Sequence, residues 1–318
     1  MPDLDLDFDY TFCDTASSVQ AALPVLRNSA ILAFDCEGQH LGTAGGRLSL
    51  ISLHAIQPPS PDVGQRTFIF DVLRLKRKAL RGVYDILESD DVLKVVFDGR
   101  KDYSCLFHDR RVVFRNVIDL QLADIRSRHV RGEGDAARMN RLKDCMQPSE
   151  LYRNRHLYRQ VHKLNGLKNC AKEHIGYTAT RGPRFDHSLW LERPLAEDYI
   201  RHAVEDVVLI CSLYLFFRDA GYLYSQISGD SMRYVSIYND RQPTLDDGFR
   251  SHGLLPLDIL DHAEGGIRGT CVYCERSLPK SCFSKGNWAG GVGNRQCQVC
   301  RAVMFPPFWL QRKRLGRQ

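Results

Sequence analysis

Five short apolar runs constrain the fold of this chain more than any other feature of its sequence. They are Ile31–Phe34, Leu48–Leu53, Thr67–Phe70, Leu93–Phe97 and Val117–Ile118. Their length and composition are typical of buried strands. Helical patterns lie between and after them, at Leu75–Leu87, Tyr103–Phe107, Leu164–His174 and Leu195–Phe217. A group of strands followed by strands that alternate with helices predicts an α/β domain over about residues 25–225.

Two carboxylates follow the first run directly, in the stretch FDCEG. Because residues two apart on a strand share a face, Asp35 and Glu37 should project together while Cys36 points the other way. Paired carboxylates repel each other unless cations neutralise them, and two divalent ions do this in phosphoryl-transfer sites. The alternative, that the two acids simply close the strand, stays open because Asp-x-Glu is a common pattern.

Further acids occur after the fourth run and within the last helical pattern. Asp98 and Asp102 follow the fourth run, and Asp102 opens a predicted helix. Asp206 lies in a strongly apolar helical stretch, where an unpartnered acid is costly to bury. A salt bridge to Arg201 or Arg218 is the alternative explanation for Asp206.

Together these segments resemble the three motifs of the four-carboxylate (DEDD) 3′–5′ exonuclease superfamily, in its ribonuclease D and egalitarian-like branch. FDCEG is similar to the first motif, VVFDGRKDYSCL to the second, and LNGLKNCAKEHIG with SLWLERPLAEDYIRHAVEDVVLICSLY to the run through the third. The resemblance implies a ribonuclease-H-like mixed sheet flanked by helices and two Mg²⁺ or Mn²⁺ ions. It also implies hydrolysis of the terminal 3′ phosphodiester of a single strand, with RNA favoured over DNA. The implied metal ligands are Asp35, Glu37, Asp102 and Asp206.

Two positions depart from the family pattern. His202 stands where this branch has Tyr, four residues before the last Asp, whereas the sister branch places its His five residues before. Residues i and i+4 share a helix face, so His202 still points where Asp206 points, and a neutral imidazole can act as a general base. Asp98 stands where Asn is usual and adds a negative charge. These departures keep an alternative open, in which a weak or inactive nuclease fold serves as a nucleic-acid-binding or protein adaptor in RNA processing or silencing.

A basic insertion, residues 126–163, interrupts the exonuclease pattern. It holds ten Lys or Arg against four Asp or Glu, so its charge matches the net +6 of the whole chain. Tyr152 and Tyr158 are interleaved with the arginines, and cations with aromatic rings suit a single-stranded nucleic acid. A solvated helical insertion is the alternative. The candidate contacts are Arg138, Arg141, Arg153, Arg155 and Arg159.

The chain has 11 cysteines, and its first ten residues, MPDLDLDFDY, lack the basic residues of a signal peptide. We therefore expect a reducing compartment, the nucleus or the cytoplasm, where thiols are free or metal-bound. The longest apolar run, Leu209–Phe217, is too short to span a bilayer, so we expect no membrane association.

Four of the cysteines form two C-x-x-C pairs. Cys271, Cys274, Cys297 and Cys300 predict one closed, tetrahedral, structural Zn²⁺ site rather than free thiols that share this spacing by coincidence. With the LPKSCFSK core, this unit is similar to the fungal LIM-like zinc domain that bridges small-RNA machinery to chromatin. That implies a fungal source and a protein partner. The expected segments are an acidic stretch 1–24, an exonuclease domain 25–225, a linker 226–266, a zinc domain 267–305 and a basic tail 306–318.

Overall fold

The computed structural model describes residues 9–56, 67–178, 185–260, 262 and 265–307. The chain forms two compact units. Unit 1 comprises Met1–Asp124 with Gly166–Leu245, and unit 2 comprises Ile125–Asn165 with Asp246–Gln318. The first eight residues of the expected acidic stretch and the end of the expected basic tail, from residue 308, lie outside the described residues.

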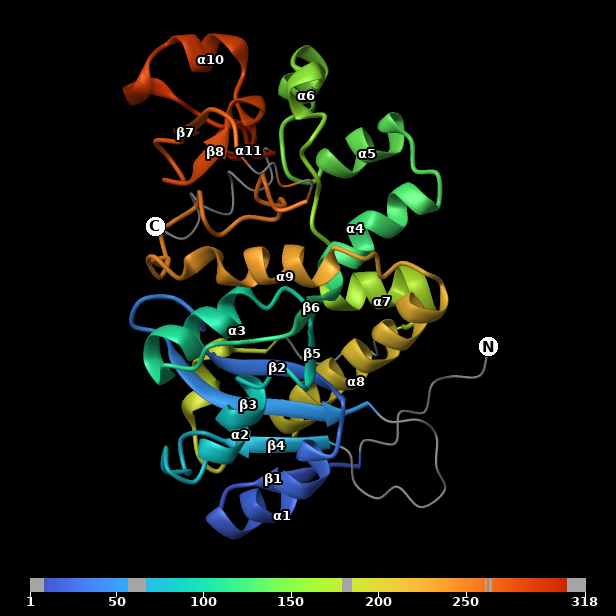
Figure 1. The fold of residues 1–318 in the computed structure, drawn as a ribbon, viewed down its shortest axis with the longest axis vertical. Coiled ribbons are helices and arrows are strands. Elements are labelled where there is room, and N and C mark those ends of the chain that lie inside the picture. The colour runs from blue at the N-terminus through green and yellow to red at the C-terminus, as the bar shows by residue number, and fades with distance from the viewer. Residues whose placement is uncertain (1–8, 57–66, 179–184, 261, 263–264, 308–318) are drawn as a thin grey trace. The chain divides into compact units, whose positions relative to one another are not determined.

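Unit 1 is built on a six-stranded mixed sheet, which Figure 1 shows edge to edge from β1 to β6. In order across the sheet, the strands are β1 (Thr11–Cys13), β4 (Thr67–Asp71), β3 (Arg47–Ala55), β2 (Ile31–Gln39), β5 (Leu93–Val96) and β6 (Val117–Asp119). β3 runs antiparallel to β2 and β4, and the other neighbours are parallel. All five predicted strands are present, and the mixed sheet with flanking helices confirms the predicted fold class.

Helices cover both faces of the sheet. On one face they are α1 (Ala16–Arg27), α2 (Arg81–Leu87) and α3 (Arg100–Cys105), the last continued by a π-helical turn η1 (Leu106–Arg110). On the other face they are α7 (Leu167–Ile175) and α8 (Glu197–Asp219). Further elements of unit 1 are the turns η3 (His187–Leu191) and η4 (Ser236–Tyr238) and the helix α9 (Ile227–Val235), and the chain passes into unit 2 within α4 (Leu120–Val130).

The side chains of β2 alternate between these two layers. Leu32, Phe34 and Cys36 pack in the core with α1 and α2, whereas Ala33 packs in the core with α7 and α8. The alternation therefore assigns the odd-numbered residues of β2, the two candidate carboxylates among them, to the α8 face.

Unit 1 differs at both ends from the expected exonuclease domain. β1 and most of α1 lie within the stretch expected to be an acidic segment, and α9 lies within the expected linker. The sequence pattern of α9 is weak because its buried face carries polar groups as well as Tyr234 and Val235. Asp230 accepts a hydrogen bond from Tyr224 at 2.8 Å, and Ser231 accepts one from the backbone of Asp119 at 2.8 Å.

Unit 2 joins the basic insertion and the C-terminal region in one hydrophobic core. The insertion supplies α5 (Asp135–Leu142), α6 (Pro148–Arg153) and η2 (Arg155–Tyr158). The C-terminal region supplies β7 (Arg268–Thr270), β8 (Ser277–Pro279), η5 (Lys280–Cys282), α10 (Lys285–Ala289), η6 (Val292–Asn294) and α11 (Gln298–Met304). The shared core holds Met139, Leu142 and Tyr158 with Phe283 and Val299. The structure thus differs from the expected division, which placed the insertion in the exonuclease domain.

Candidate active site

The first two candidate residues come from β2, at a bend in the strand. Asp35 and Glu37 lie on the α8 face, and Cys36 between them is buried on the other face, as predicted. A β-bulge between Glu37 and Gly38 interrupts the pairing with β3. Gly38 is required there because a Cβ would lie 2.1 Å from the carbonyl oxygen of Arg47. The regular strand pairing of β2 is therefore interrupted immediately after Glu37.

Asp102, in the first turn of α3, is tied to β2 by a hydrogen bond. The side chain of this buried residue accepts at Oδ1 from the backbone N–H of Cys36 at 3.0 Å. The same helix is held to the loop after β2, because Ser104 donates to the carbonyl of Gly42 at 2.8 Å. Gly42 has φ +68°, and a Cβ there would lie 2.3 Å from the carbonyl oxygen of Lys101, so only glycine permits this approach.

The long helix α8 carries the fourth carboxylate and the histidine. His202 and Asp206 share one face of α8, as predicted, and Nε2 of His202 lies 3.7 Å from Oδ2 of Asp206. The same nitrogen lies 3.8 Å from Oε1 of Glu37 on β2. Glu37, His202 and Asp206 can present one ligand atom each within 4.8 Å of one another. α8 thus brings the third-motif residues to the carboxylates of the first motif.

Burial raises the pKa values of all four carboxylates. Burial, followed by the charges of the neighbouring acids, raises the pKa of Asp35 and of Glu37 well above the ordinary value. Burial, followed by the charges of Asp98 and Asp119, raises the pKa of Asp102 to about 7. Burial also raises the pKa of Asp206, against the opposing effects of His202 and Lys168. Burial and nearby negative charge both favour the protonated form of a carboxyl group.

Asp206 has no salt bridge to the two arginines that the sequence offered as alternatives. Arg201 pairs with Glu197 at 3.3 Å, and Arg218 pairs with Asp219 at 2.8 Å. Within the part of the chain that the structure describes, Oδ1 of Asp206 is buried without a hydrogen-bond partner. A buried carboxylate oxygen without a hydrogen-bond partner is suited to bind a cation.

The negative charge of Asp98, expected to weaken the site, is neutralised by its own neighbour. Arg100 donates from Nε to Oδ1 of Asp98 at 2.5 Å and from Nη2 to Oδ2 at 2.8 Å. The guanidinium also lies 4.8 Å from the centre of the Tyr234 ring, whose hydroxyl donates to Asp98 at 3.2 Å. Asp98 has φ +57°, a conformation that Asn and Asp tolerate better than most residues. The departure from Asn at this position is therefore compensated by Arg100.

Aromatic rings confine His202. The Phe185 ring stacks on it with centroids 4.3 Å apart, and the Trp190 ring lies 6.2 Å away. Tyr199 meets Trp190 edge to face at 4.8 Å. Neither Phe185 nor Trp190 was predicted as a site residue, although Trp190 lies within the run that is similar to the third motif.

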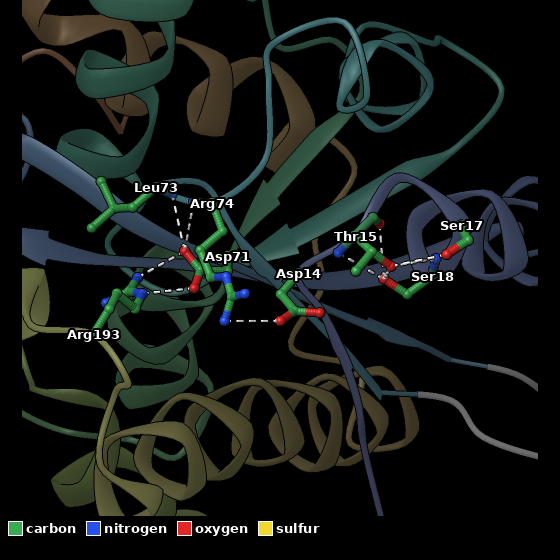
Figure 2. A network of polar contacts seen from close by, with 8 residues as sticks. All are labelled: Asp14, Thr15, Ser17, Ser18, Asp71, Leu73, Arg74 and Arg193. Carbon is green, nitrogen blue, oxygen red and sulfur yellow. Dashed lines mark hydrogen bonds and ion pairs between the residues drawn. The ribbon is translucent and has the colours of Figure 1, made fainter.

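Arg193, three residues after Trp190, ties the turn η3 to the sheet. It donates to both carboxylate oxygens of Asp71 at the end of β4, at 2.6 and 2.9 Å, as Figure 2 shows. It also donates to the hydroxyl of Ser49 on β3 at 2.9 Å and to the carbonyl of Trp190 at 3.0 Å. Figure 2 shows a second, separate pair beside it, Arg74 with Asp14. Asp71 is fully buried, so the Arg193 pair anchors the start of α8.

The cysteine quartet gathers within unit 2. The sulfur atoms of Cys271, Cys274, Cys297 and Cys300 all lie within 4.8 Å of one another, and all four residues are buried. Backbone N–H groups of Cys297 and Cys300 donate to the sulfurs of Cys271 and Cys297, each at 3.4 Å. Four thiols at this separation are the donor set of a tetrahedral Zn²⁺ site.

The candidate arginines of the insertion fall into two groups. Arg138 donates to the carbonyls of Tyr158 and Val161 and pairs with Asp135, which also pairs with Arg155. Arg141 pairs with Glu133 at 2.8 Å. The other two, Arg153 and Arg159, are exposed. Of the two tyrosines, Tyr158 is buried in the core, whereas Tyr152 is 88% exposed. The structure therefore gives Arg138, Arg141 and Arg155 acidic partners within unit 2.

No helix in the described part of the chain has both the length and the apolar character that crossing a membrane requires.

Comparison with known proteins identifies the family to which the chain belongs. The family model described as 3′–5′ exonuclease matches residues 10–220. The structure of ribonuclease D from Trypanosoma brucei in complex with RNA U12 superposes with a TM-score of 0.58 at 20% identity, covering 86% of this chain and 84% of that one. The piRNA biogenesis protein EXD1 of Mus musculus is 23% identical over 222 residues, which are 69% of this chain and 34% of that protein.

The human piRNA biogenesis protein EXD1 is 38% identical over a shorter stretch of 61 residues, 19% of this chain and 12% of that protein. The matched stretches thus span 34% of the mouse protein and 12% of the human protein. The family match covers the sheet, α3 and α8, which are the elements that gather the carboxylates. The chain belongs to the four-carboxylate (DEDD) 3′–5′ exonuclease family.

Proposed function

We propose that the protein is a metal-dependent 3′–5′ exonuclease that removes nucleotides from single-stranded 3′ ends, with RNA as the preferred substrate. The observation that carries the proposal is the cluster of Asp35, Glu37, Asp102 and Asp206, whose pKa values are all raised by burial. The charges of the other acids in the cluster raise the pKa values of Asp35 and Glu37 further. The preference for RNA rests on the likeness to a ribonuclease D bound to RNA and on the piRNA biogenesis relatives.

The four carboxylates fit two divalent cations. The cluster has an excess of negative charge, and Oδ1 of Asp206 lacks a hydrogen-bond partner among the described residues. When bound, Mg²⁺ or Mn²⁺ lowers the pKa of water and stabilises charge on the leaving 3′ oxygen. Asp35, Glu37, Asp102 and Asp206 would hold the ions.

The protein's own groups then position the reactants and move one proton. Nε2 of His202, which faces Glu37 and Asp206, would accept a proton from the attacking water as a general base. Phe185 and Trp190 shield the ring from bulk water. The hydrogen bond between Cys36 and Asp102 keeps α3 at a fixed distance from β2.

The remaining assignments concern unit 2. Cys271, Cys274, Cys297 and Cys300 would bind one structural Zn²⁺, with no open position for catalysis. The exposed Arg153 and Arg159, beside the exposed Tyr152, would contact single-stranded nucleic acid. The zinc-binding region would also dock a protein partner, which is the role that its sequence resemblance implies.

The experiment is to incubate the full chain with a 5′-labelled single-stranded RNA and Mn²⁺. We expect a ladder that shortens from the 3′ end, slower shortening of the matching DNA, and no shortening by Asp35→Asn. Binding of the RNA without any ladder would overturn the proposal in favour of the adaptor function, which the replacement of Tyr by His202 keeps as the second candidate. A ladder from Asp35→Asn equal to that of the wild type would mean that the site lies elsewhere.

A further inference from the structure

Five basic residues form a surface of unit 1 outside the candidate active site. Lys76, Arg77 and Lys78 lie in the loop between β4 and α2, and Arg110 and Arg111 lie at the end of η1. All are exposed except Arg110, which is half-buried. The two segments touch, because Nη2 of Arg77 donates to the carbonyl of Arg110 at 2.5 Å. We call these five residues the basic surface.

The acidic residues around the basic surface do not neutralise it. They pair instead with three neighbouring arginines: Asp14 with Arg74, Asp85 and Glu88 with Arg81, and Asp90 with Arg115. Asp109, which precedes Arg110 in the chain, accepts a hydrogen bond from Sγ of Cys105 at 3.4 Å. Within the described residues, none of the five cations pairs with a carboxylate. Their positive charge is therefore available to a ligand.

Arg111 has a backbone conformation that glycine adopts more readily. It ends η1 with φ +58° and ψ +37°, in the left-handed region, where the residue after a helix is usually glycine. An arginine there costs stability relative to glycine, and such strain is found most often at functional positions. Beside it, Nε of Arg110 is buried and has no hydrogen-bond partner in the described part of the chain.

The basic surface is connected to the candidate active site through both of its segments. Asp71, the last residue of β4, is paired with Leu50, and Leu50 is paired with Glu37, so the loop after β4 leaves the sheet level with the carboxylates. Asp102 and Arg110 lie eight residues apart on the continuous helix of α3 and η1, about 12 Å along its axis. A strand several nucleotides long can therefore reach from one to the other.

The chemistry of the basic surface fits phosphates better than a protein partner. Protein interfaces have an apolar or aromatic centre. Among the described residues of 72–81 and 106–115, Val113 is the one large apolar side chain that is exposed, at 44%. Phe107 is half-buried and Phe114 is buried, so neither segment exposes a ring on which a base could stack. Lysine and arginine without such rings neutralise backbone phosphates whatever the base sequence.

Resting on the proposed function, we propose that the basic surface binds backbone phosphates of the substrate strand upstream of its 3′ end. The 3′ end occupies the carboxylate site while phosphates several nucleotides away contact the five cations. Binding through this surface is independent of base sequence, and it requires a strand long enough to span both places.

The first test measures binding by fluorescence anisotropy in EDTA, with a labelled single-stranded RNA of about 16 nucleotides. We expect the triple variant Lys76→Ala, Lys78→Ala, Arg111→Gly to raise Kd about tenfold or more and to lower the salt slope by about two to three units. The matched control replaces Arg74, Arg81 and Arg115 by alanine, which removes the same charge from arginines that already pair with acids. Equal effects of the two triple variants, or an unchanged slope in the first, would overturn the proposal.

Arg111→Gly alone separates loss of binding from loss of folding. Because glycine suits the left-handed conformation, we expect the urea midpoint to rise or stay the same while the salt slope falls by about one unit. Arg111→Lys keeps the charge and should keep the slope. A Gly variant with the slope of the wild type would contradict the assignment of Arg111 to the basic surface.

Hydrolysis in Mn²⁺ separates this proposal from the proposed function. We expect the first triple variant to lower kcat/KM about tenfold for a strand of about 16 nucleotides and much less for one of about 4. If the wild type cleaves no strand, the exonuclease function fails, yet the salt slopes in EDTA still decide whether the basic surface binds phosphates. If the wild type cleaves and the triple variant binds and cleaves both strands equally well, this proposal fails while the exonuclease function stands. An acidic protein segment would then be the ligand to test.

Discussion

The buried carboxylates should make the stability of the metal-free protein fall as pH rises. The pKa of Asp102 is raised from 3.8 to about 7 in the fold, so the folded state binds its proton more tightly than the unfolded state. The stabilisation from this proton is fully present below the unfolded pKa of 3.8 and is lost as pH rises toward about 7. We expect the urea midpoint in EDTA to fall over this range, and to fall less in Asp102→Asn. Parallel curves for wild type and variant would contradict the raised pKa of Asp102, and added Mn²⁺ should remove most of the difference.

We expect activity to depend strongly on His202. Loss of a general base lowers the rate by about 10²–10⁴-fold, which we expect for kcat of His202→Ala on a labelled single strand. His202→Tyr restores the residue usual in this branch at the same helical position and should keep or raise activity. Inert wild-type protein with an active Tyr variant would identify a decayed nuclease. Equal rates for Ala, Tyr and His would mean that His202 has no chemical part.

At the scale of single elements, the position of the start of α8 depends on one buried ion pair, between Arg193 and Asp71. Arg193→Met leaves the fully buried Asp71 with an unpaired charge, and breaking such a pair costs about 3–5 kcal/mol. Arg74→Met breaks the more exposed pair with Asp14, whose worth is less than about 1 kcal/mol. We expect chemical denaturation of unit 1 to separate the two variants clearly. Equal effects would show that Arg193 does not anchor the turn before α8.

The strands and the motif residues could be predicted from the sequence because each rests on a local rule. Alternation placed Asp35 and Glu37 on one face, and the i to i+4 spacing placed His202 with Asp206. The stacking of Phe185 on His202 could not be predicted, since it depends on how a loop folds over the helix. The compensation of Asp98 by Arg100 was missed for a different reason: a pair two residues apart carries no periodic signal.

The pairing of the basic insertion with the C-terminal region also lay beyond sequence patterns. The insertion is charged, but α5 buries Met139 and Leu142 against residues more than a hundred positions later. Arg301 of α11 donates to Glu150 at 2.9 Å, and the backbone of Gln147 donates to that of Phe305 at 2.8 Å. No local sequence pattern in either segment predicts that it packs against a segment so far away in the sequence.

For the whole molecule, nucleic-acid binding should depend on the two exposed candidate arginines that form no ion pair within the described residues, Arg153 and Arg159. We expect Arg153→Ala with Arg159→Ala to weaken binding of a single strand and to lower the salt dependence by about one unit of slope for each lost contact. Arg155→Ala is the matched control, because its guanidinium is held by Asp135. Fluorescence anisotropy at several salt concentrations measures both effects. An unchanged slope in the double variant would place the nucleic-acid contacts elsewhere.

Removal of zinc should unfold more than the region that holds the cysteines. Structural zinc supplies folding free energy, and the core of unit 2 includes Cys271 and Cys300 together with Leu142 and Tyr158. We expect chelation, or Cys271→Ser, to remove hydrogen-exchange protection from α5 and η2 as well as from α11, while β2 and β3 stay protected. Mass spectrometry resolves these segments. Retained protection of α5 would show that the insertion folds without the zinc-binding region.

The interleaving of the two units also orders events during synthesis. The ribosome delivers residues 125–165 before the residues that complete unit 1, and delivers Asp246–Gln318 last. The core around Met139, Leu142 and Met146 is therefore completed only when α11 has emerged. During that interval unit 1 can assemble around its own sheet, since Gly166–Leu245 has already been made. A nascent chain stalled before Cys297 would carry all four candidate carboxylates and an arginine-rich segment whose core is incomplete.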